Sequence, residues 1–322
     1  MEKILEVRNL TVHYYLPQGV VRALENVSFD LYKGEILGVA GESGSGKSTL
    51  AQAILRLVQH PGKIVSGEII FKGTDLLRLS EREMRSIRGR KIAMIFQDPN
   101  SYLNPVHQVG MQVGEVFEAH NGGGYKKYIP KVAELFKIVK IADPIKRVYA
   151  YPHQMSGGMK QRVLISMSIA ENPDLILADE PTSALDVTIQ AEIVDLLRDI
   201  RDKYGSSIIF ITHDLSLLLE ISDRIMIMYA GRIAEIGTRD EIKNDPKHPY
   251  TKALLKSLTY ERKRRLYSIP GSIPSLINPP SGCRFAPRCS EALDICSLRE
   301  PPKIQISDRV VYCHLYGGDS NE

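Results

Sequence analysis

The chain has 322 residues, enough for one large domain with additions or for two modest domains. Lys and Arg total 42 against 38 Asp and Glu, and this near balance excludes a global charge field that would attract nucleic acid or an anionic membrane. No window reaches the roughly 18 uncharged apolar residues of a membrane span, and the start has no signal-peptide pattern. We therefore expect a soluble, cytoplasmic protein.

The first 40 residues predict three strands. The segments EVRNLTVHYY (6–15) and VRALENVSFDLYKG (21–34) alternate apolar and polar residues around the turn signals Pro17 and Gly19. This alternation is typical of antiparallel strands with one wet face. The segment EILGVA (35–40) is almost continuously apolar, which favours a strand buried on both faces.

A glycine-rich loop follows, GESGSGKST (41–49), and helical spacing resumes from Lys47. A glycine, four residues and then Gly-Lys-Ser form the pattern of a phosphate-binding loop, in which backbone N–H groups converge on phosphate oxygens at a helix N-terminus. Lys47 would reach the β and γ phosphates, and the Ser48 hydroxyl would bind Mg²⁺. The alternative, a merely flexible loop, does not explain the strand before it and the helix after it.

Further along, apolar runs at 91–97, 175–180 and 207–214 alternate with helical patterns such as residues 188–204. This alternation predicts a parallel sheet wrapped by helices, with a helical subdomain over about 98–170. The segment RIMIMYAGRIAEIG (224–237) predicts a hairpin that turns at AGR.

Acidic residues crowd the segment DEPTSALD (179–186), at the end of one apolar run. Asp179 is placed at the carboxyl end of a buried strand, where open α/β sheets gather their ligands. We expect Asp179 to complete the Mg²⁺ shell and Glu180 to orient or deprotonate the attacking water. A solvated acidic turn is the alternative.

Four further segments narrow the class of triphosphatase: MSGGMKQR (155–162), Gln97 in IFQDP, SALD (183–186) and His213 in ITHD. With the phosphate loop, their order closely resembles the ATP-binding subunits of ABC transporters. The resemblance implies an α/β fold, a P-loop NTPase core with an antiparallel β subdomain, a helical subdomain and a small C-terminal module. MSGGM departs from the commonest form of the family signature, LSGGQ, at both ends.

The resemblance also implies roles for individual residues. Ser156, Gly157 and Gly158 would cap ATP held by a partner in a head-to-tail dimer, and Asp186 would organise the partner's site. Gln97 would bond metal and water, and His213 would contact the γ-phosphate. Tyr14 matches the position that stacks on adenine, with Tyr15 as the second choice and packing on the sheet as the alternative. The residues assigned to ATP and Mg²⁺ are Tyr14, Gly41, Ser43, Gly44, Ser45, Gly46, Lys47, Ser48, Thr49, Gln97, Ser156, Gly157, Gly158, Asp179, Glu180, Asp186 and His213.

Composition changes near residue 255, where the chain becomes dense in Pro, Gly and Cys. We expect an ATP-binding domain at 1–255 and an appended module at 256–322. The segments HPYTKALL (248–255) and NPPSGCRFAPRC (278–289) resemble the C-terminal extension of importers for oligopeptides, dipeptides, nickel and, in some members, oligosaccharides. The resemblance indicates an importer rather than an exporter.

The cysteines are confined to this module, at Cys283, Cys289, Cys296 and Cys313. Their spacing lacks the close pairs of common zinc sites, and a reducing cytoplasm disfavours disulfides. Four thiolates in a proline-rich loop suit a [4Fe–4S] cluster, which some members of this importer branch carry. Zn²⁺ and free thiols remain as alternatives. Because every assigned nucleotide contact precedes residue 214, we expect ATP binding not to depend on this module.

The sequence thus predicts an ATPase that powers import of peptides, or of a related solute such as oligosaccharide or nickel, from the cytoplasmic face of the cell membrane as a peripheral subunit. Its expected partners are membrane permease subunits, a second identical or homologous ATPase and, indirectly, an extracellular or periplasmic solute-binding protein, with no nucleic acid. The alternatives are an ABC-type ATPase of nucleic-acid repair or translation, and an iron–sulfur sensor with a vestigial ATPase. The sequence has no second phosphate loop and no sustained heptads, which argues against the repair or translation alternative. The complete catalytic set argues against the sensor.

Overall fold

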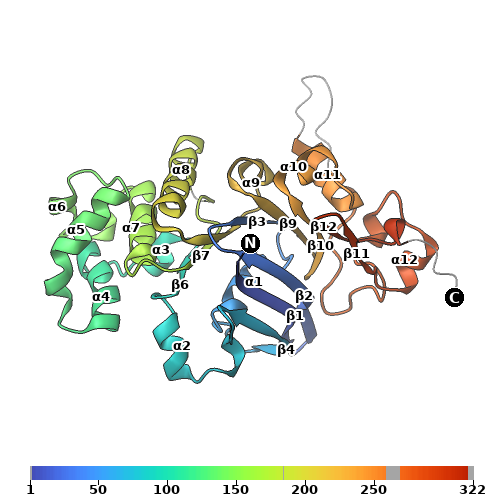
Figure 1. The fold of residues 1–322 in the computed structure, drawn as a ribbon, viewed down its shortest axis with the longest axis horizontal. Coiled ribbons are helices and arrows are strands. Elements are labelled where there is room, and N and C mark those ends of the chain that lie inside the picture. The colour runs from blue at the N-terminus through green and yellow to red at the C-terminus, as the bar shows by residue number, and fades with distance from the viewer. Residues whose placement is uncertain (1, 184, 259–268, 318–322) are drawn as a thin grey trace. The chain divides into compact units, whose positions relative to one another are not determined.

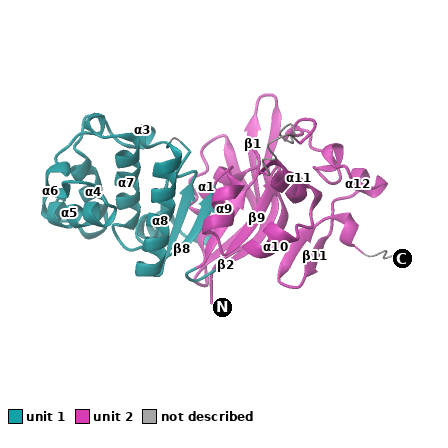
Figure 2. Ribbon diagram, turned by 90° about the horizontal axis from the view of Figure 1, so that it is seen from above, with its two compact units in different colours: residues 1, 32–34, 78–211 teal, residues 2–31, 35–77, 212–322 magenta. Residues whose placement is uncertain are grey.

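A computed structural model describes residues 2–183, 185–258 and 269–317. The chain divides into two compact units, shown in different colours in Figure 2. Unit 1 contains residues 32–34 and 78–211, and unit 2 contains residues 2–31, 35–77 and the chain from 212 onward. Both units are discontinuous in sequence, because the chain leaves the second unit at residue 77 and returns to it at residue 212.

Unit 1 is built on three parallel strands in the order β8-β7-β6. They are β6 (Ile92–Ile95), β7 (Leu175–Asp179) and β8 (Ser207–Ile211). Every residue of β7 and β8 is buried, as expected for parallel strands that are covered on both faces. The apolar runs therefore predicted these strands correctly.

Helices make up most of the rest of unit 1 (Figure 1). All residues from 96 to 174 are described, and this stretch contains helices and no strand, which agrees with the predicted helical block. The helices of unit 1 are α2 (Glu81–Ile87), α3 (Pro99–Tyr102), α4 (Val109–Asn121), α5 (Ile129–Ile138), α6 (Pro144–Arg147), α7 (Gly157–Ile169), α8 (Val187–Tyr204) and the 3-10 turns Tyr125–Tyr128 and Pro152–Gln154.

Unit 2 contains an antiparallel sheet in the order β2-β1-β4-β5. Its strands are β1 (Lys3–Leu16), β2 (Gly19–Tyr32), β4 (Gly62–Phe71) and β5 (Thr74–Asp75). The turn between β1 and β2 falls at the predicted Pro17. Alternate side chains of β1 and β2 are buried along much of their length, so one face of this sheet packs on the core.

The other strands of unit 2 follow the order β11-β12-β10-β9-β3. Strand β3 (Ile36–Ala40) is fully buried and runs parallel to β9 (Arg224–Tyr229), which forms the predicted hairpin with β10 (Arg232–Thr238). The C-terminal hairpin of β11 (Lys303–Ile306) and β12 (Arg309–Tyr312) then pairs with β10. The C-terminal hairpin therefore extends the sheet that contains β3.

Short helices surround these strands. The proposed domain boundary at 255 falls within one of them, α11, and remains a prediction. The helices of unit 2 are α1 (Lys47–Ile54), α9 (Leu215–Ile221), α10 (Arg239–Asn244), α11 (Pro249–Leu258), α12 (Asp294–Leu298) and the 3-10 turns Ala286–Arg288 and His314–Tyr316.

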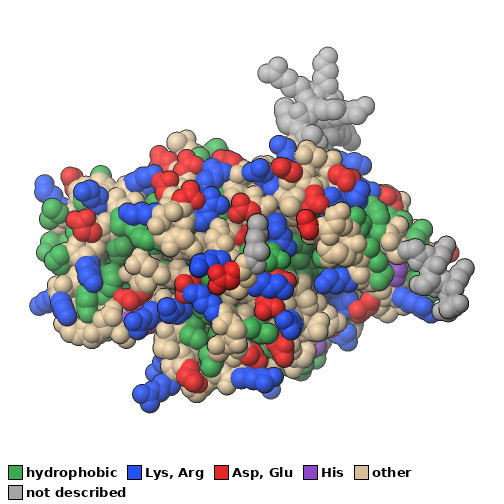
Figure 3. Space-filling view, viewed as in Figure 1, with side chains coloured by type: hydrophobic (Ala, Val, Ile, Leu, Met, Phe, Trp, Pro, Cys, Tyr) green, Lys and Arg blue, Asp and Glu red, His purple; other side chains and the backbone are tan. Residues whose placement is uncertain are grey.

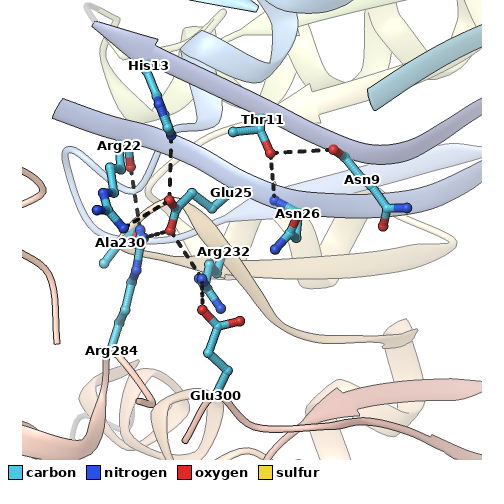
Figure 4. A network of polar contacts seen from close by, with 10 residues as sticks. All are labelled: Asn9, Thr11, His13, Arg22, Glu25, Asn26, Ala230, Arg232, Arg284 and Glu300. Carbon is cyan, nitrogen blue, oxygen red and sulfur yellow. Dashed lines mark hydrogen bonds and ion pairs between the residues drawn. The ribbon is translucent and has the colours of Figure 1, made fainter. Parts of the chain in front are cut away.

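Buried ion pairs fasten the C-terminal segment, residues 269–317, to the rest of unit 2 (Figure 4). The Arg284 guanidinium, only 3% exposed, donates to the carboxylate of Glu25 on β2 and to the carbonyl of Ala230. Arg232 on β10 bridges Glu25, at 3.1 Å, and Glu300. Losing one partner of such a network leaves an uncompensated buried charge, so the network fixes where the segment sits.

Charge on the visible surface is mixed in sign. On the face drawn in Figure 3, Lys and Arg side chains are interspersed with Asp and Glu, in keeping with the formal net charge of +4. Among the described residues, none of the helices combines the length and the apolar character that crossing a membrane requires.

Candidate functional site

The phosphate loop lies between buried strand β3 and helix α1 of unit 2, as predicted. Gly46 is the N-cap of α1 with φ 98°, and a Cβ there would lie 2.6 Å from the carbonyl oxygen of Ala23. A larger residue would therefore clash with the backbone as well as strain its own. The tip of the loop, Ser43 and Gly44, is exposed, and Ser45 is buried. The loop thus offers its tip, at the N-terminus of α1, to a ligand.

Lys47 begins α1 and folds back over the loop. Its side-chain Nζ donates to the carbonyl oxygens of Gly41, at 2.7 Å, and Glu42, at 3.1 Å, and the residue is 6% exposed. The Ser45 N–H also donates to the Glu42 carbonyl, at 3.1 Å. A buried ammonium held on carbonyl oxygens is positioned for anions that enter the loop, because the carbonyls fix its position without neutralising its charge. Ser48 and Thr49 follow on the first turn of the same helix.

His213 lies in the same unit as the phosphate loop. The Thr212 N–H donates to the Val39 carbonyl of β3, at 3.2 Å, so the chain entering His213 runs beside the strand that leads to Gly41. The His213 side chain is exposed. Asp214 then caps α9 by accepting from the Ser216 N–H at 2.8 Å, which fixes the turn on its other side.

Tyr14 is half-buried near the end of β1 and pairs with Gly62 of β4. A Cβ on Gly62 would lie 2.6 Å from a ring carbon of Tyr14, so the ring packs directly over this glycine. Tyr15, the second choice for adenine, is 47% exposed and lies under the Lys63 ammonium, 5.6 Å from the ring centroid. Tyr14 is thus the more firmly held of the two rings.

In unit 1, Asp179 ends β7 and is 5% exposed, and Glu180 follows in a left-handed conformation with φ 46°. The Glu180 N–H donates to the Ile211 carbonyl of β8 at 2.9 Å, which holds the turn. The Gln97 amide, just after β6, donates to the Glu180 carboxylate at 3.0 Å. The carboxyl ends of three parallel strands therefore bring the expected water-activating acid and the expected glutamine into contact.

Ser156 and Asp186 are both helix N-caps in unit 1. Ser156 Oγ accepts from the Met159 N–H, at 3.3 Å, at the start of α7, and Asp186 accepts from the Ile189 N–H, at 3.1 Å, at the start of α8. A Cβ on Gly158 would lie 2.8 Å from Ile189, so the α7 N-terminus packs closely on α8. Within its own chain, the third acid of DEPTSALD is thus a capping residue; Ala184 of that segment lies outside the described residues.

The predicted nucleotide residues fall into two sets, one in each unit. Unit 2 holds Tyr14, the phosphate loop and His213, and unit 1 holds Gln97, Asp179, Glu180, the signature residues and Asp186. Within unit 2 the loop folds around Lys47, and within unit 1 the Gln97 amide contacts the Glu180 carboxylate.

All four cysteines line one small cavity of unit 2, together with His248, Phe285 and His314. The Cys283 N–H donates to the Cys296 carbonyl at 2.7 Å, and burial raises the pKa of Cys283, Cys289 and Cys313, the last to about 11. Within residues 2–183, 185–258 and 269–317, however, no group of three or more His, Cys, Asp or Glu side chains is arranged to hold a metal ion. The four thiols therefore share a cavity, but their arrangement in the described residues is not that of a metal site.

Sequence reasoning did not assign a role at the phosphate loop to Glu42, Tyr250 or Arg288. Glu42 belongs to the loop itself, and its carboxylate pairs with Arg288 at 2.7 Å while its N–H donates to the Tyr250 hydroxyl at 3.0 Å. Arg288 directly precedes Cys289, but nothing in the local pattern indicates a partner that lies 246 positions earlier in the chain.

Comparisons with known proteins agree with this geometry. Residues 24–183 match the family model described as ABC transporter, and residues 234–296 match the model described as oligopeptide/dipeptide transporter, C-terminal region. The chain is 47% identical to the dipeptide transport ATP-binding protein DppD of Haemophilus influenzae, covering 97% of this chain and 95% of that protein. It is 49% identical to the oligopeptide transport ATP-binding protein OppD of Bacillus subtilis, covering 95% and 87%.

Solved structures share the fold. A dimeric post-hydrolysis state of the ATP-binding cassette MJ0796, bound to ADP and Pi, superposes with a TM-score of 0.65 at 29% identity, covering 73% of this chain and 98% of that one. The structure described as cbiO1 from Clostridium perfringens, part of the ABC transporter complex cbiONQ, superposes with a TM-score of 0.64 at 28% identity, covering 76% of this chain and 92% of that one.

Proposed function

Because the chain belongs to the family of ATP-binding subunits of peptide ABC transporters, we propose that it hydrolyses ATP to power the import of dipeptides or oligopeptides through separate membrane permease subunits. The observation that supports ATP hydrolysis is the phosphate loop, which wraps around the buried Lys47 at the start of α1. The relatives' names and the C-terminal family model supply the peptide class. Oligosaccharide and nickel stay as the other candidate solutes that the resemblance in sequence implies.

The proposed division of labour follows the two sets of residues. Backbone N–H groups of residues 41–46, Lys47, Ser48 and Thr49 bind the phosphates, and Tyr14 stacks on adenine. Ser48, Asp179 and Gln97 would hold Mg²⁺, which when bound neutralises charge on the phosphates. Buried Asp179 and exposed Gln97 offer oxygen donors of the kind that this cation prefers.

Glu180 is the proposed general base. Its carboxylate would accept a proton from the attacking water while the Gln97 amide, 3.0 Å away, fixes the orientation of that carboxylate. His213 would contact the γ-phosphate. Ser156, Gly157, Gly158 and Asp186 would act on ATP held by a second ATPase subunit in a head-to-tail dimer, at the cytoplasmic face of the membrane. Support for the dimer comes from the dimeric state of the solved cassette.

We also propose that Cys283, Cys289, Cys296 and Cys313 hold a [4Fe–4S] cluster with a structural role, with Zn²⁺ as the alternative. The support is the common cavity that the four thiols line and the soft donor set they provide. Anaerobically purified protein should then be brown and contain about four irons per chain, and replacing any one cysteine by serine should remove the colour. Colourless protein with one zinc and no iron would reject the cluster and leave the ATPase proposal intact.

The function is tested with the full chain and its Lys47→Ala variant. The wild type should bind ATP and, together with permease subunits that co-purify with it, release phosphate. Lys47→Ala should raise the Kd for ATP, because the lost charge contacts phosphates in the ground state as well as in the transition state. An unchanged Kd would remove the phosphate-loop assignment, and co-purification with nucleic acid in place of permeases would favour the repair or translation alternative.

A further inference from the structure

The C-terminal segment contacts the phosphate loop through an ion pair between Arg288 and Glu42 of the loop. The Arg288 guanidinium forms a two-bond fork with the Glu42 carboxylate, at 2.7 and 3.1 Å. The Glu42 N–H donates to the Tyr250 hydroxyl at 3.0 Å, and the Glu42 carbonyl accepts from Lys47 Nζ and from the Ser45 N–H. Its N–H, carbonyl and carboxylate therefore all take part in bonds that fix the loop.

Further hydrogen bonds hold the Arg288 side chain in this position. Beyond the fork, its Nη1 donates to the Tyr229 hydroxyl at 3.2 Å, its Nη2 to the Ile269 carbonyl at 3.3 Å and its Nε to the Pro270 carbonyl at 2.9 Å. All five N–H donors of the guanidinium thus have partners, and the side chain is 6% exposed. A bidentate pair held in this way sets direction as well as distance.

Aromatic packing stiffens the support beneath the fork. The rings of Tyr229, Tyr250 and Phe285 form a cluster with centroids 4.7 to 5.2 Å apart, and the guanidinium carbon of Arg288 lies 5.8 Å from the Tyr229 ring centroid. Tyr250 is completely buried. The hydroxyl that accepts from Glu42 therefore has little freedom to move away.

We propose that Arg288 and Tyr250 are positioning residues for ATP binding: through Glu42 they hold the phosphate loop, and with it Lys47, in the geometry that receives the phosphates. The affinity for ATP then depends on Arg288 of the C-terminal segment, contrary to the sequence-based expectation that ATP binding does not depend on residues 256–322. This proposal rests on the assignment of residues 41–49 to the phosphate loop.

The test measures the Kd for ATP with Mg²⁺ by calorimetry on the full chain and on Arg288→Ala, Glu42→Gln and the double variant. Each single change should weaken ATP binding by about 5- to 50-fold, and the double variant should be little weaker than either single one, because directly contacting residues couple strongly. A Kd within twofold of the wild type in both single variants, or effects that simply multiply in the double variant, would overturn the proposal.

Two milder variants keep the test valid if Arg288→Ala folds poorly. Arg288→Lys retains a charge but not the fork, so its Kd should fall between those of the wild type and the alanine variant. Tyr250→Phe removes only the hydroxyl that accepts the Glu42 N–H, and should weaken ATP binding while the chain stays folded. Amide hydrogen exchange at residues 41–49 should rise in both variants, whereas unchanged exchange would contradict the proposal that Arg288 and Tyr250 hold the loop through Glu42.

Arg309→Ala is the matched control. Arg309 is another buried arginine of the C-terminal segment, 5% exposed in its side chain, and it faces Glu235, Glu241 and Asp245 rather than the loop. If Arg309→Ala weakens ATP binding as much as Arg288→Ala does, general loosening of the segment is the cause and the proposal fails. Lys47→Ala separates this proposal from the proposed function. An unchanged Kd for ATP in Lys47→Ala would remove the phosphate-loop assignment itself, and with it the positioning role of Arg288 and Tyr250.

Discussion

Glu180 shows at the scale of one residue how the candidate catalytic position is fixed. Its backbone is left-handed, with φ 46°, a conformation that a non-glycine residue adopts only when its surroundings enforce it. The enforcement is the hydrogen bond from its N–H to the Ile211 carbonyl, at 2.9 Å. Strand β7 therefore ends at Asp179, and the turn directs the Glu180 carboxylate toward the Gln97 amide.

Glu180→Gln should lower turnover by about 10²- to 10⁴-fold, the usual range for losing a general base, while ATP and Mg²⁺ still bind. Phosphate release and the Kd for ATP measure the two effects separately. Glu134→Gln, the same change on an exposed position of α5, is the control and should leave both unchanged. Near-normal hydrolysis in Glu180→Gln would assign the role in activating water to another residue, with His213 the first candidate.

At the scale of an element, α8 shows one residue carrying two proposed roles. Asp186 caps the helix by accepting from the Ile189 N–H, and its charge lies at the positive end of the helix dipole. At the other end, Gly205 stops α8 in a left-handed conformation with φ 68°. The capping role is local to this chain, and the proposed role at the partner's site requires the dimer.

Asp186→Ala should reduce the free energy of unfolding by about 0.5–2 kcal/mol, because it leaves an N–H of α8 without its acceptor. Asp186→Asn caps a helix about as well as aspartate does, and should be close to the wild type in a denaturant titration. If Asp186→Asn is stable but has lost ATPase activity, the charge acts beyond capping. Equal stability of the alanine variant and the wild type would contradict the capping role.

At the scale of the whole molecule, the proposed catalytic set is completed by a second subunit. Ser156 lies at the N-terminus of α7 in unit 1, and the phosphate loop that we propose binds this chain's own ATP lies in unit 2. A signature that acts in trans gives two shared sites per dimer.

Ser156→Arg should therefore impair hydrolysis and leave ATP binding to the isolated subunit nearly intact. In a dimer of two copies of this chain, mixing Ser156→Arg chains with Glu180→Gln chains should restore part of the phosphate release, because one of the two composite sites then carries neither change. The same two changes placed on one chain and mixed with wild type provide the comparison. Folded mixtures without any recovery would contradict the arrangement in trans.

The sequence by itself determined the features that depend on neighbouring residues. Gly46 and Lys47 mark a loop between a strand and a helix, and the run that ends at Asp179 marks a buried strand, because turn conformation and hydrophobic periodicity are local properties. The hairpin at Ala230 was predicted for the same reason. The order of motifs along the chain was enough to indicate the family.

Only the tertiary structure decided which distant residues meet. Gln97 reaches Glu180 because parallel strands end at one edge of the sheet, and β12 joins β10 and thereby makes the C-terminal segment part of the core sheet. The pairing of Arg288 with Glu42, 246 positions apart, leaves no trace in local pattern. An arginine takes whichever carboxylate the packing presents to it, so its partner is set by the fold and not by the residues beside it.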